Sequence, residues 1–159
     1  MKPEEAAGVR DLLEAHGTVT LATLGPEGPW AATVFFASDV ALNLYFVTDP
    51  RTRHGRDMAG GGPVAAAVNR DIRTWDEVLG LQMSGRASVL ADEARDRALA
   101  LDLRKFPDVA RLFERPRDAH EEVIANRLRR TAFWCLSPAW VRVVDNRRGF
   151  GWKAEYELP

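Results

Sequence analysis

Cysteine and long apolar runs are scarce in this chain of 159 residues. Its one cysteine, Cys135, cannot form an internal disulfide bond, and a single thiol within an apolar run fits a reducing compartment. No stretch reaches the roughly 18 consecutive apolar residues of a membrane-spanning helix, and the N-terminal segment MKPEEAAGVR lacks the apolar region of a signal peptide. These absences predict a cytoplasmic protein that does not enter a membrane.

The chain also lacks an excess of either charge. Its 22 basic and 23 acidic residues are interspersed, and the formal net charge is -1. A surface for nucleic acid or for an anionic membrane would need a strong positive excess, so neither is expected as a partner. The densest basic segment, RLRR at 127–130, is interpreted as the end of a helix, where cations are favoured.

Residue types that build catalytic dyads or metal centres are few and scattered. The three histidines are His16, His54 and His120, and neither they nor Cys135 come with an evident partner base. We therefore identify no catalytic residue and expect no metal site. His16, at the end of a predicted helix, is interpreted as a capping or exposed residue, and His120 as a surface residue among acidic neighbours.

The chain does contain many short β-branched and aromatic segments separated by turn residues. The first three predict an antiparallel meander with strands at 18–24, 30–37 and 44–48, joined by GPEGP at 25–29 and by a turn at 38–43. A helix is predicted before them at 4–16, because apolar residues recur there at helical spacing.

Further strands and helices follow the meander. We expect strands at 64–69, 79–90, 131–136, 139–144 and 152–158, and helices at 51–59, 92–104, 106–115 and 118–130. Gly85 is predicted to form a bulge, and Ser137-Pro138 to interrupt the late strands. Short antiparallel strands with tight turns favour a closed barrel or sandwich. The expected architecture is a single mainly β domain over 1–159, a small antiparallel β-barrel with inserted helices.

The segment Tyr45–Met58, YFVTDPRTRHGRDM, carries the clearest chemistry. An apolar strand ends at the turn Asp49-Pro50, and Arg51, Thr52, Arg53 and His54 follow at the start of a predicted helix. Hydroxyl and guanidinium groups next to the free N–H groups of a helix start offer several hydrogen bonds to an anion. We interpret this segment as a phosphate site; a solvated basic turn is the simpler alternative.

Four motifs in sequence order carry a resemblance to a known family. They are a tryptophan-led strand from Trp30, the segment 45–54, GLQMSG at 80–85 and DNRRGFG at 145–151. Together they resemble the pyridoxamine 5′-phosphate oxidase-like FMN-binding split-barrel superfamily, and within it the YhbP-like branch, over roughly residues 10–158. The resemblance implies a homodimer that holds FMN in a groove between its subunits.

The resemblance also assigns cofactor-binding positions. Thr48, Thr52, Arg53 and His54 fall where the family holds the flavin phosphate, and Gln82 falls on a strand that often places a glutamine near the flavin ring. The strand segment that lines the ring contains Ala32, Thr33, Val34 and Phe35, and ends at Phe36.

Three positions depart from the pattern of the oxidase itself. Ala32 stands in place of an arginine, Ala37 in place of a lysine that contacts the substrate phosphate, and His54 in place of a lysine that contacts the flavin phosphate. A histidine titrates near pH 6.5, so it carries only part of a charge at neutral pH. The predicted function is therefore an FMN-dependent oxidoreductase with an unknown small-molecule substrate, and not pyridoxamine phosphate oxidation.

Two other hypotheses stay open at this point. The chain could be a non-catalytic module that holds FMN, haem or the deazaflavin F420, because relatives of this fold bind each of them. Haem would require an axial histidine that faces a pocket. The chain could also be a small β-barrel with neither ligand nor catalysis, in which Arg53 contributes only surface charge.

Overall fold

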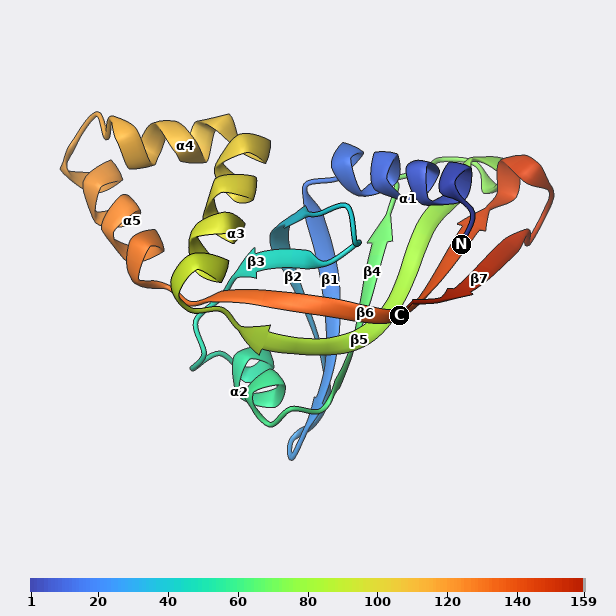
Figure 1. The fold of residues 1–159 in the computed structure, drawn as a ribbon, viewed down its shortest axis with the longest axis horizontal. Helices are drawn as coiled ribbons and strands as arrows, with labels where there is room; N and C mark the ends of the chain where they lie inside the picture. The colour runs from blue at the N-terminus through green and yellow to red at the C-terminus, as the bar shows by residue number, and fades with distance from the viewer. Residues whose placement is uncertain (159) are drawn as a thin grey trace.

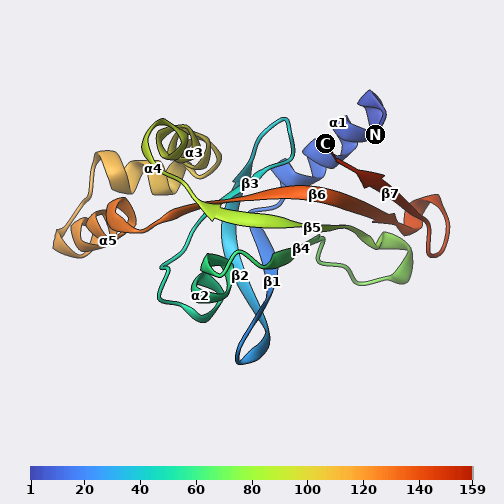
Figure 2. The same cartoon turned by 60° about the horizontal axis from the view of Figure 1, so that its bottom comes forward.

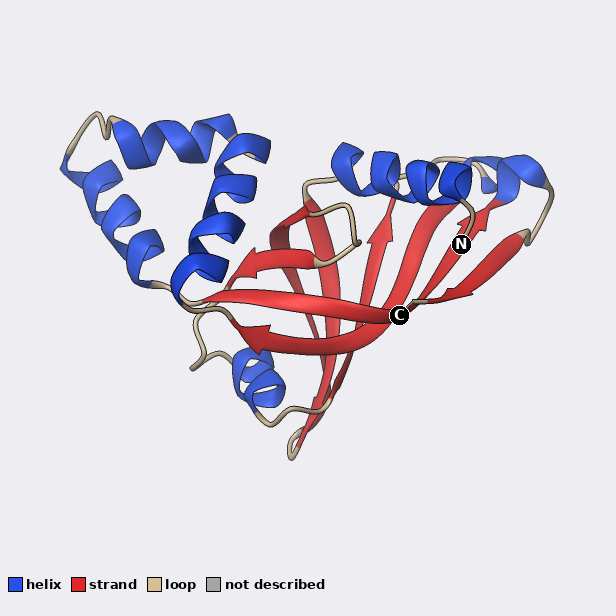
Figure 3. Ribbon diagram, in the orientation of Figure 1, coloured by secondary structure: helices blue, strands red, loops and turns tan. Residues whose placement is uncertain are grey.

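The structure, a computed structural model, describes residues 1–158 and is built on one strongly twisted antiparallel sheet (Figures 1 and 3). The sheet order is β3-β2-β1-β4-β5-β6-β7, and β3 also pairs with β6, so the first six of these strands close into a ring. The strands are β1 Thr18–Gly25, β2 Gly28–Ser38, β3 Leu44–Val47, β4 Pro63–Asn69, β5 Leu79–Val89, β6 Phe133–Asp145 and β7 Lys153–Glu157. The predicted mainly β split-barrel fold is confirmed.

The core lies inside the ring because apolar residues alternate along the strands. In β1, Val19 and Leu21 are fully buried and point inward, whereas Thr20 between them and Thr18 and Ala22 on either side point outward. Partner residues in neighbouring strands share a face, so Ala66 and Met83 continue the inner layer. This period of two is the expected pattern of a sheet with one face buried.

The last long strand differs from its prediction. Two segments separated at Ser137-Pro138 were expected, but β6 is one continuous strand of 13 residues. Pro138 is tolerated because the β5–β6 register shifts between Ser84 and Gly85, where the ladder is already irregular. The predicted bulge at Gly85 is confirmed. A continuous β6 pairs with β3 in its first part and with β7 in its second.

Two helices cover the barrel from opposite sides. Helix α1, Pro3–Ala15, lies across one end of the sheet and buries Val9, Leu12 and Leu13 (Figure 1). Helix α2, Arg53–Ala59, lies near the other end and contacts β1 and β5. It begins two residues later than predicted because Thr52 is its N-cap: the Thr52 hydroxyl accepts a hydrogen bond from the Gly55 N–H.

Three helices inserted between β5 and β6 stand beside the barrel (Figures 1 and 2). They are α3 Asp92–Lys105, α4 Pro107–Glu114 and α5 Ala119–Arg130. Lys105 Nζ donates to the Leu13 carbonyl at 2.8 Å, and the Phe106 ring meets Phe35 edge-on at 5.5 Å. The basic segment 127–130 ends α5, as predicted. None of the helices within residues 1–158 is long and apolar enough to cross a membrane.

Candidate functional site

Three residues of the predicted phosphate segment form a compact cluster where β3 leads into α2. His54 Nε2 lies 2.7 Å from the Thr48 hydroxyl and 3.2 Å from the Thr52 hydroxyl. The Thr52 hydroxyl also donates to the Asp49 carbonyl at 2.8 Å. The cluster is therefore prearranged, and its members hydrogen-bond to one another.

The electrostatics of His54 follow from its partly buried position. Burial lowers its pKa below the usual 6.5, and the nearby Asp57 carboxylate offsets this only in part. His54 is then mainly neutral at pH 7, so it adds little positive charge to the site. Its geometry suits the orientation of the two threonine hydroxyls.

Arg53 supplies the positive charge, and it reaches a distant hairpin. Its Nη2 donates to the Glu27 carbonyl at 2.6 Å, and its guanidinium carbon lies 4.6 Å from the centre of the Trp30 ring. Its Nε is buried and has no hydrogen-bond partner among residues 1–158. A buried guanidinium N–H without a partner is costly, and a shift of the Arg53 guanidinium toward an anionic group would satisfy it.

The edge of β2 next to Arg53 is open. Residues 28–35 pair with β1 on one side, but β3 pairs with β2 only at 36–38 on the other. Within the described part of the chain, the outer edge of β2 over 28–35 therefore has no strand partner. Its free backbone groups can bind the edge of a planar heterocycle.

The four ring-lining candidates lie on this segment but do not share a face. Ala32 and Val34 point inward opposite Leu21 and Val19, whereas Thr33 and Phe35 point outward. Phe35 is 68% exposed. A ligand along this edge would therefore meet the backbone of all four residues and the side chains of only two.

Gln82 lies on the outer face of β5, away from the Arg53 cluster. Cross-strand pairs form a row on this face that runs from Thr33 through Thr20 and Ala67 to Gln82. Three strand spacings of about 4.8 Å separate Gln82 from Thr33 by roughly 14 Å. Gln82 Oε1 accepts from Arg142 Nη1 at 3.0 Å. The structure therefore does not bring Gln82 together with the other candidates in one chain.

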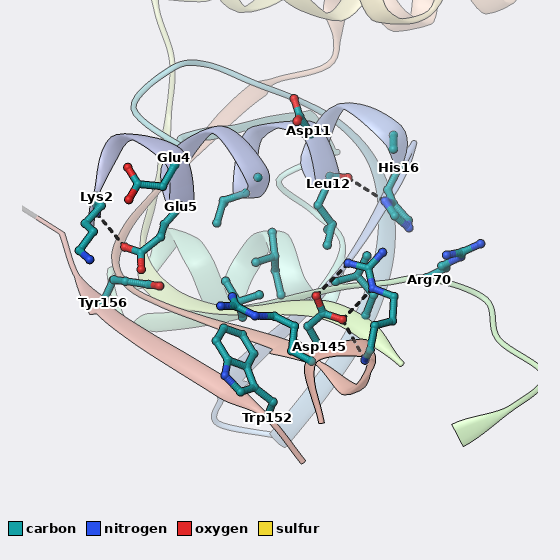
Figure 4. Close-up of a pocket in the computed structure, with 18 residues that line it drawn as sticks. Lys2, Glu4, Glu5, Asp11, Leu12, His16, Arg70, Asp145, Trp152 and Tyr156 are labelled. Carbon is teal, nitrogen blue, oxygen red and sulfur yellow. Dashed lines mark hydrogen bonds and ion pairs between the residues drawn. The ribbon is translucent and has the colours of Figure 1, made fainter. Parts of the chain in front are cut away.

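A second feature is a cavity of about 920 Å³ between α1 and the ends of β5, β6 and β7 (Figure 4). Its walls mix apolar residues with four acidic and four basic side chains: Lys2, Glu4, Glu5, Gly8, Val9, Asp11, Leu12, Ala15, His16, Arg70, Leu79, Leu81, Val143, Asp145, Arg147, Arg148, Trp152 and Tyr156. Segments from both ends of the chain meet here, so no local sequence pattern predicted the cavity.

The motif DNRRGFG shapes one wall of this cavity. Arg147 Nε and Nη2 donate to the two Asp145 oxygens at 2.7 and 2.8 Å, which lowers the pKa of that carboxyl. The Arg148 guanidinium stacks 3.8 Å above the Trp152 ring. Asn146 holds the loop, because its amide donates to the Trp75 carbonyl and accepts from the Gly151 N–H. The motif therefore has a structural role in this fold.

His16 lines the same cavity, and its tautomer can be assigned. Its Nδ1 lies 2.7 Å from the Leu12 carbonyl oxygen, which can only accept a hydrogen bond (Figure 4). Nδ1 therefore carries the proton, and Nε2 of the neutral ring keeps its lone pair. The predicted capping role is confirmed, but His16 is also a potential metal ligand.

The sequence profile of the pyridoxamine 5′-phosphate oxidase family matches residues 6–145. The chain belongs to this family. The UPF0306 protein YhbP of Salmonella typhi is 30% identical over 128 residues, which cover 80% of this chain and 76% of that protein. The resemblance inferred from the four motifs is confirmed.

Solved structures of other proteins share this fold. A heme binding protein of Mycobacterium smegmatis superposes with a TM-score of 0.73 at 20% identity, over 99% of this chain and 59% of that chain. A Clostridium acetobutylicum protein related to a general stress protein of the pyridoxine phosphate oxidase family gives a TM-score of 0.69 at 13% identity, over 99% and 97% of the two chains. Identities this low establish the fold alone.

Proposed function

We propose that the chain binds FMN at the open edge of β2 and acts as a flavin-dependent oxidoreductase on a small molecule. The observation that carries this proposal is Arg53, whose buried Nε has no partner while its guanidinium lies beside Trp30 and the unpaired edge. These residues fit a phosphate followed by a planar ring, because the donor set combines the fixed charge of Arg53 with the Thr48 hydroxyl.

Each residue of the site then has a distinct role. Arg53 binds the phosphate, and the Thr48 hydroxyl donates a hydrogen bond to it. His54 orients that hydroxyl, and Thr52, whose own hydroxyl proton goes to the Asp49 carbonyl, helps to hold His54 in place. The backbone of Ala32–Phe35 binds the edge of the ring. FMN supplies the redox chemistry when bound, and the protein supplies binding and orientation. Ala37 is buried and Ala32 carries no charge, so neither position offers a cation to pyridoxamine phosphate.

The outer sheet face supports a homodimer as part of the proposal. Small side chains cover this face over three strands, including Ala22, Ala31, Ala65 and Ala67, and Phe35 is exposed at its border. A face of small residues lets a second copy approach closely. A two-fold pairing would bring the partner's Gln82 to the flavin ring, which one chain cannot do. We place this dimer in the cytoplasm, where the single buried thiol stays reduced.

Titration with matched ligands tests the proposal. The purified protein is mixed with FMN, with riboflavin and with a deazaflavin, and quenching of their fluorescence gives each dissociation constant. We expect FMN to bind much more tightly than riboflavin, because only FMN carries the phosphate that Arg53 recognises. Equal affinity for the two, or no affinity for FMN, would contradict the phosphate site. Reduction of bound FMN by NADH or NADPH then tests oxidoreductase activity.

Haem binding is a second candidate, favoured by His16. Its Nε2 lone pair, held in place by the Nδ1–H to Leu12 carbonyl bond, lines a cavity within the usual range of about 300–1,000 Å³ for cofactor sites. A cationic Arg70 in the same wall suits a haem carboxylate. Ferric haem titration separates the candidates: His16→Ala should abolish a Soret shift that His120→Ala, on an exposed helical surface, retains. Identical spectra for both variants would rule out His16 as the ligand.

A further inference from the structure

A basic cavity lies on the far side of the loop that carries the phosphate segment. Strands β3 and β6 are antiparallel, with Val47 opposite Phe133, and the Thr48 N–H donates to the Ala132 carbonyl at 3.2 Å. This direction carries the loop Asp49–Arg51 past the junction of α5 and β6 (Figures 1 and 2). The arginines at the end of α5 therefore meet Arg51, which is far from them in the sequence.

The cavity has a volume of about 620 Å³ and both charged and apolar walls. Its lining consists of Asp49, Pro50, Arg51, Val123, Asn126, Arg127, Arg130, Thr131 and Ala132. Three arginines face one acid, so the lining has an excess of positive charge. The volume exceeds that of a single inorganic ion and suits a small organic molecule.

The acid in this lining is already neutralised. Arg51 Nε and Nη2 bind the Asp49 carboxylate at distances between 2.6 and 3.1 Å. Arg51, and to a lesser extent Arg127, hold the pKa of Asp49 at about 2. Asp49 thus positions Arg51 at the rim and attracts Arg127 only weakly, and neither Arg127 nor Arg130 forms an ion pair with it.

Arg127 and Arg130 are not needed to cap their helix. Arginines at a helix C-terminus commonly serve its unpaired carbonyl groups. Here the Thr131 N–H and hydroxyl both donate to the Arg127 carbonyl, and Arg129 Nη2 donates to the Phe113 carbonyl in α4. Within residues 1–158, the side chains of Arg127 and Arg130 form neither a hydrogen bond nor an ion pair.

We propose that this cavity binds a phosphorylated small molecule, with its phosphate held by Arg127 and Arg130 and its organic part packed against Pro50 and Val123. Two guanidinium groups can bind one phosphate through paired hydrogen bonds. Val123 is 66% exposed and provides the apolar wall. The site is separate from the Arg53 cluster and does not depend on flavin binding.

Calorimetric titration with phenyl phosphate tests this site. The probe joins a phosphate to an apolar ring, and the full-length protein should bind it with a stoichiometry of one. Arg127→Gln with Arg130→Gln should weaken binding by roughly tenfold or more. The charge-matched control is Arg97→Gln with Arg104→Gln on the exposed side of α3, which should bind as the unaltered protein does. FMN affinity should be unchanged in both pairs, which separates this test from that of the flavin site.

Each other result would overturn the proposal. No binding, many weak sites, or equal weakening in the α3 control would mean only nonspecific attraction to positive charge. Loss of binding in Arg53→Ala alone would assign the phosphate to the flavin site. If inorganic phosphate bound as tightly as phenyl phosphate, and Val123→Ser had no effect on the affinity, the cavity would recognise phosphate alone and not an organic ligand. If a single-stranded oligonucleotide bound more tightly than phenyl phosphate, and did so through Arg127 and Arg130, the ligand of this cavity would be a nucleic acid.

Discussion

Arg53 connects two segments that are far apart in the chain. It starts α2, yet its guanidinium contacts the carbonyl groups of the β1–β2 hairpin and the ring of Trp30. The neighbouring Arg56 also reaches this hairpin, but it forms an exposed ion pair with Glu27 at 3.1 Å. The two arginines on one short helix therefore differ in burial and in available donors.

Replacement of Arg53 should weaken FMN binding strongly. A charge-assisted hydrogen bond contributes about 1.5–3 kcal/mol, so Arg53→Ala should raise the FMN dissociation constant between roughly tenfold and a hundredfold. Arg56→Ala is the matched control, because exposed ion pairs contribute little, and it should change the constant less than about threefold. Fluorescence titration measures both, and equal effects would show that Arg53 acts only through overall charge.

Asp102 in α3 makes stability depend on pH. Burial raises its pKa from 3.8 to about 6, against the partial attraction of Lys105. The folded state thus binds the Asp102 proton more tightly than the unfolded state does. The stability that this proton contributes is complete below pH 4 and is lost as pH rises through 6. Asp102→Asn should stabilise the fold at pH 7.5 by roughly 1–2 kcal/mol after allowance for solvent contact. Urea unfolding at pH 4 should give Asp102→Asn no gain in the free energy of unfolding over the unaltered protein. The same gain at both pH values would exclude ionisation of Asp102 as its cause.

The sequence predicted the residue types of the site but not their contacts. A run of threonines and cations after a strand indicated an anion site by composition alone. The pairing of His54 with both threonines stays within one segment of seven residues. The reach of Arg53 to residue 27 depends instead on how β1, β2 and α2 pack, and a contact between segments more than twenty residues apart leaves no local pattern in the sequence.

At the level of elements, Gly85 decides whether β5 and β6 can pair along their full length. The Ser137 carbonyl and Pro138 approach the Gly85 backbone so closely that a Cβ there would collide with them. A local rule assigned a break to Pro138, and that assignment was wrong because the compensating glycine lies on another strand. Patterns within one strand cannot reveal such a pair.

An added methyl group at this contact should be costly. Gly85→Ala should destabilise the fold by about 1–3 kcal/mol, or more if the strands separate, because backbone must move to admit the Cβ. Gly62→Ala, where a Cβ would meet no atom within 4 Å, is the control and should change stability little. Thermal unfolding measures both variants, and equal melting temperatures would contradict the close approach of β5 and β6.

At the level of the whole molecule, the barrel separates three regions that could bind ligands. The open β2 edge and the outer sheet face lie outside the ring, the large cavity lies under α1, and the basic cavity lies against the inserted helices. The family and its barrel could be recognised from four motifs in order. Neither cavity was predicted from the sequence, because each is lined by segments from distant parts of the chain.

Gel filtration of the protein after addition of FMN, with light scattering and a visible absorption spectrum recorded across the peak, tests the FMN site and the dimer together. We expect flavin absorption bands that remain with a particle of twice the 17.7 kDa chain mass, at one FMN per chain. A colourless peak, whatever its mass, would contradict the assignment of the Arg53 site to FMN. Flavin retained by a single chain would contradict the shared groove.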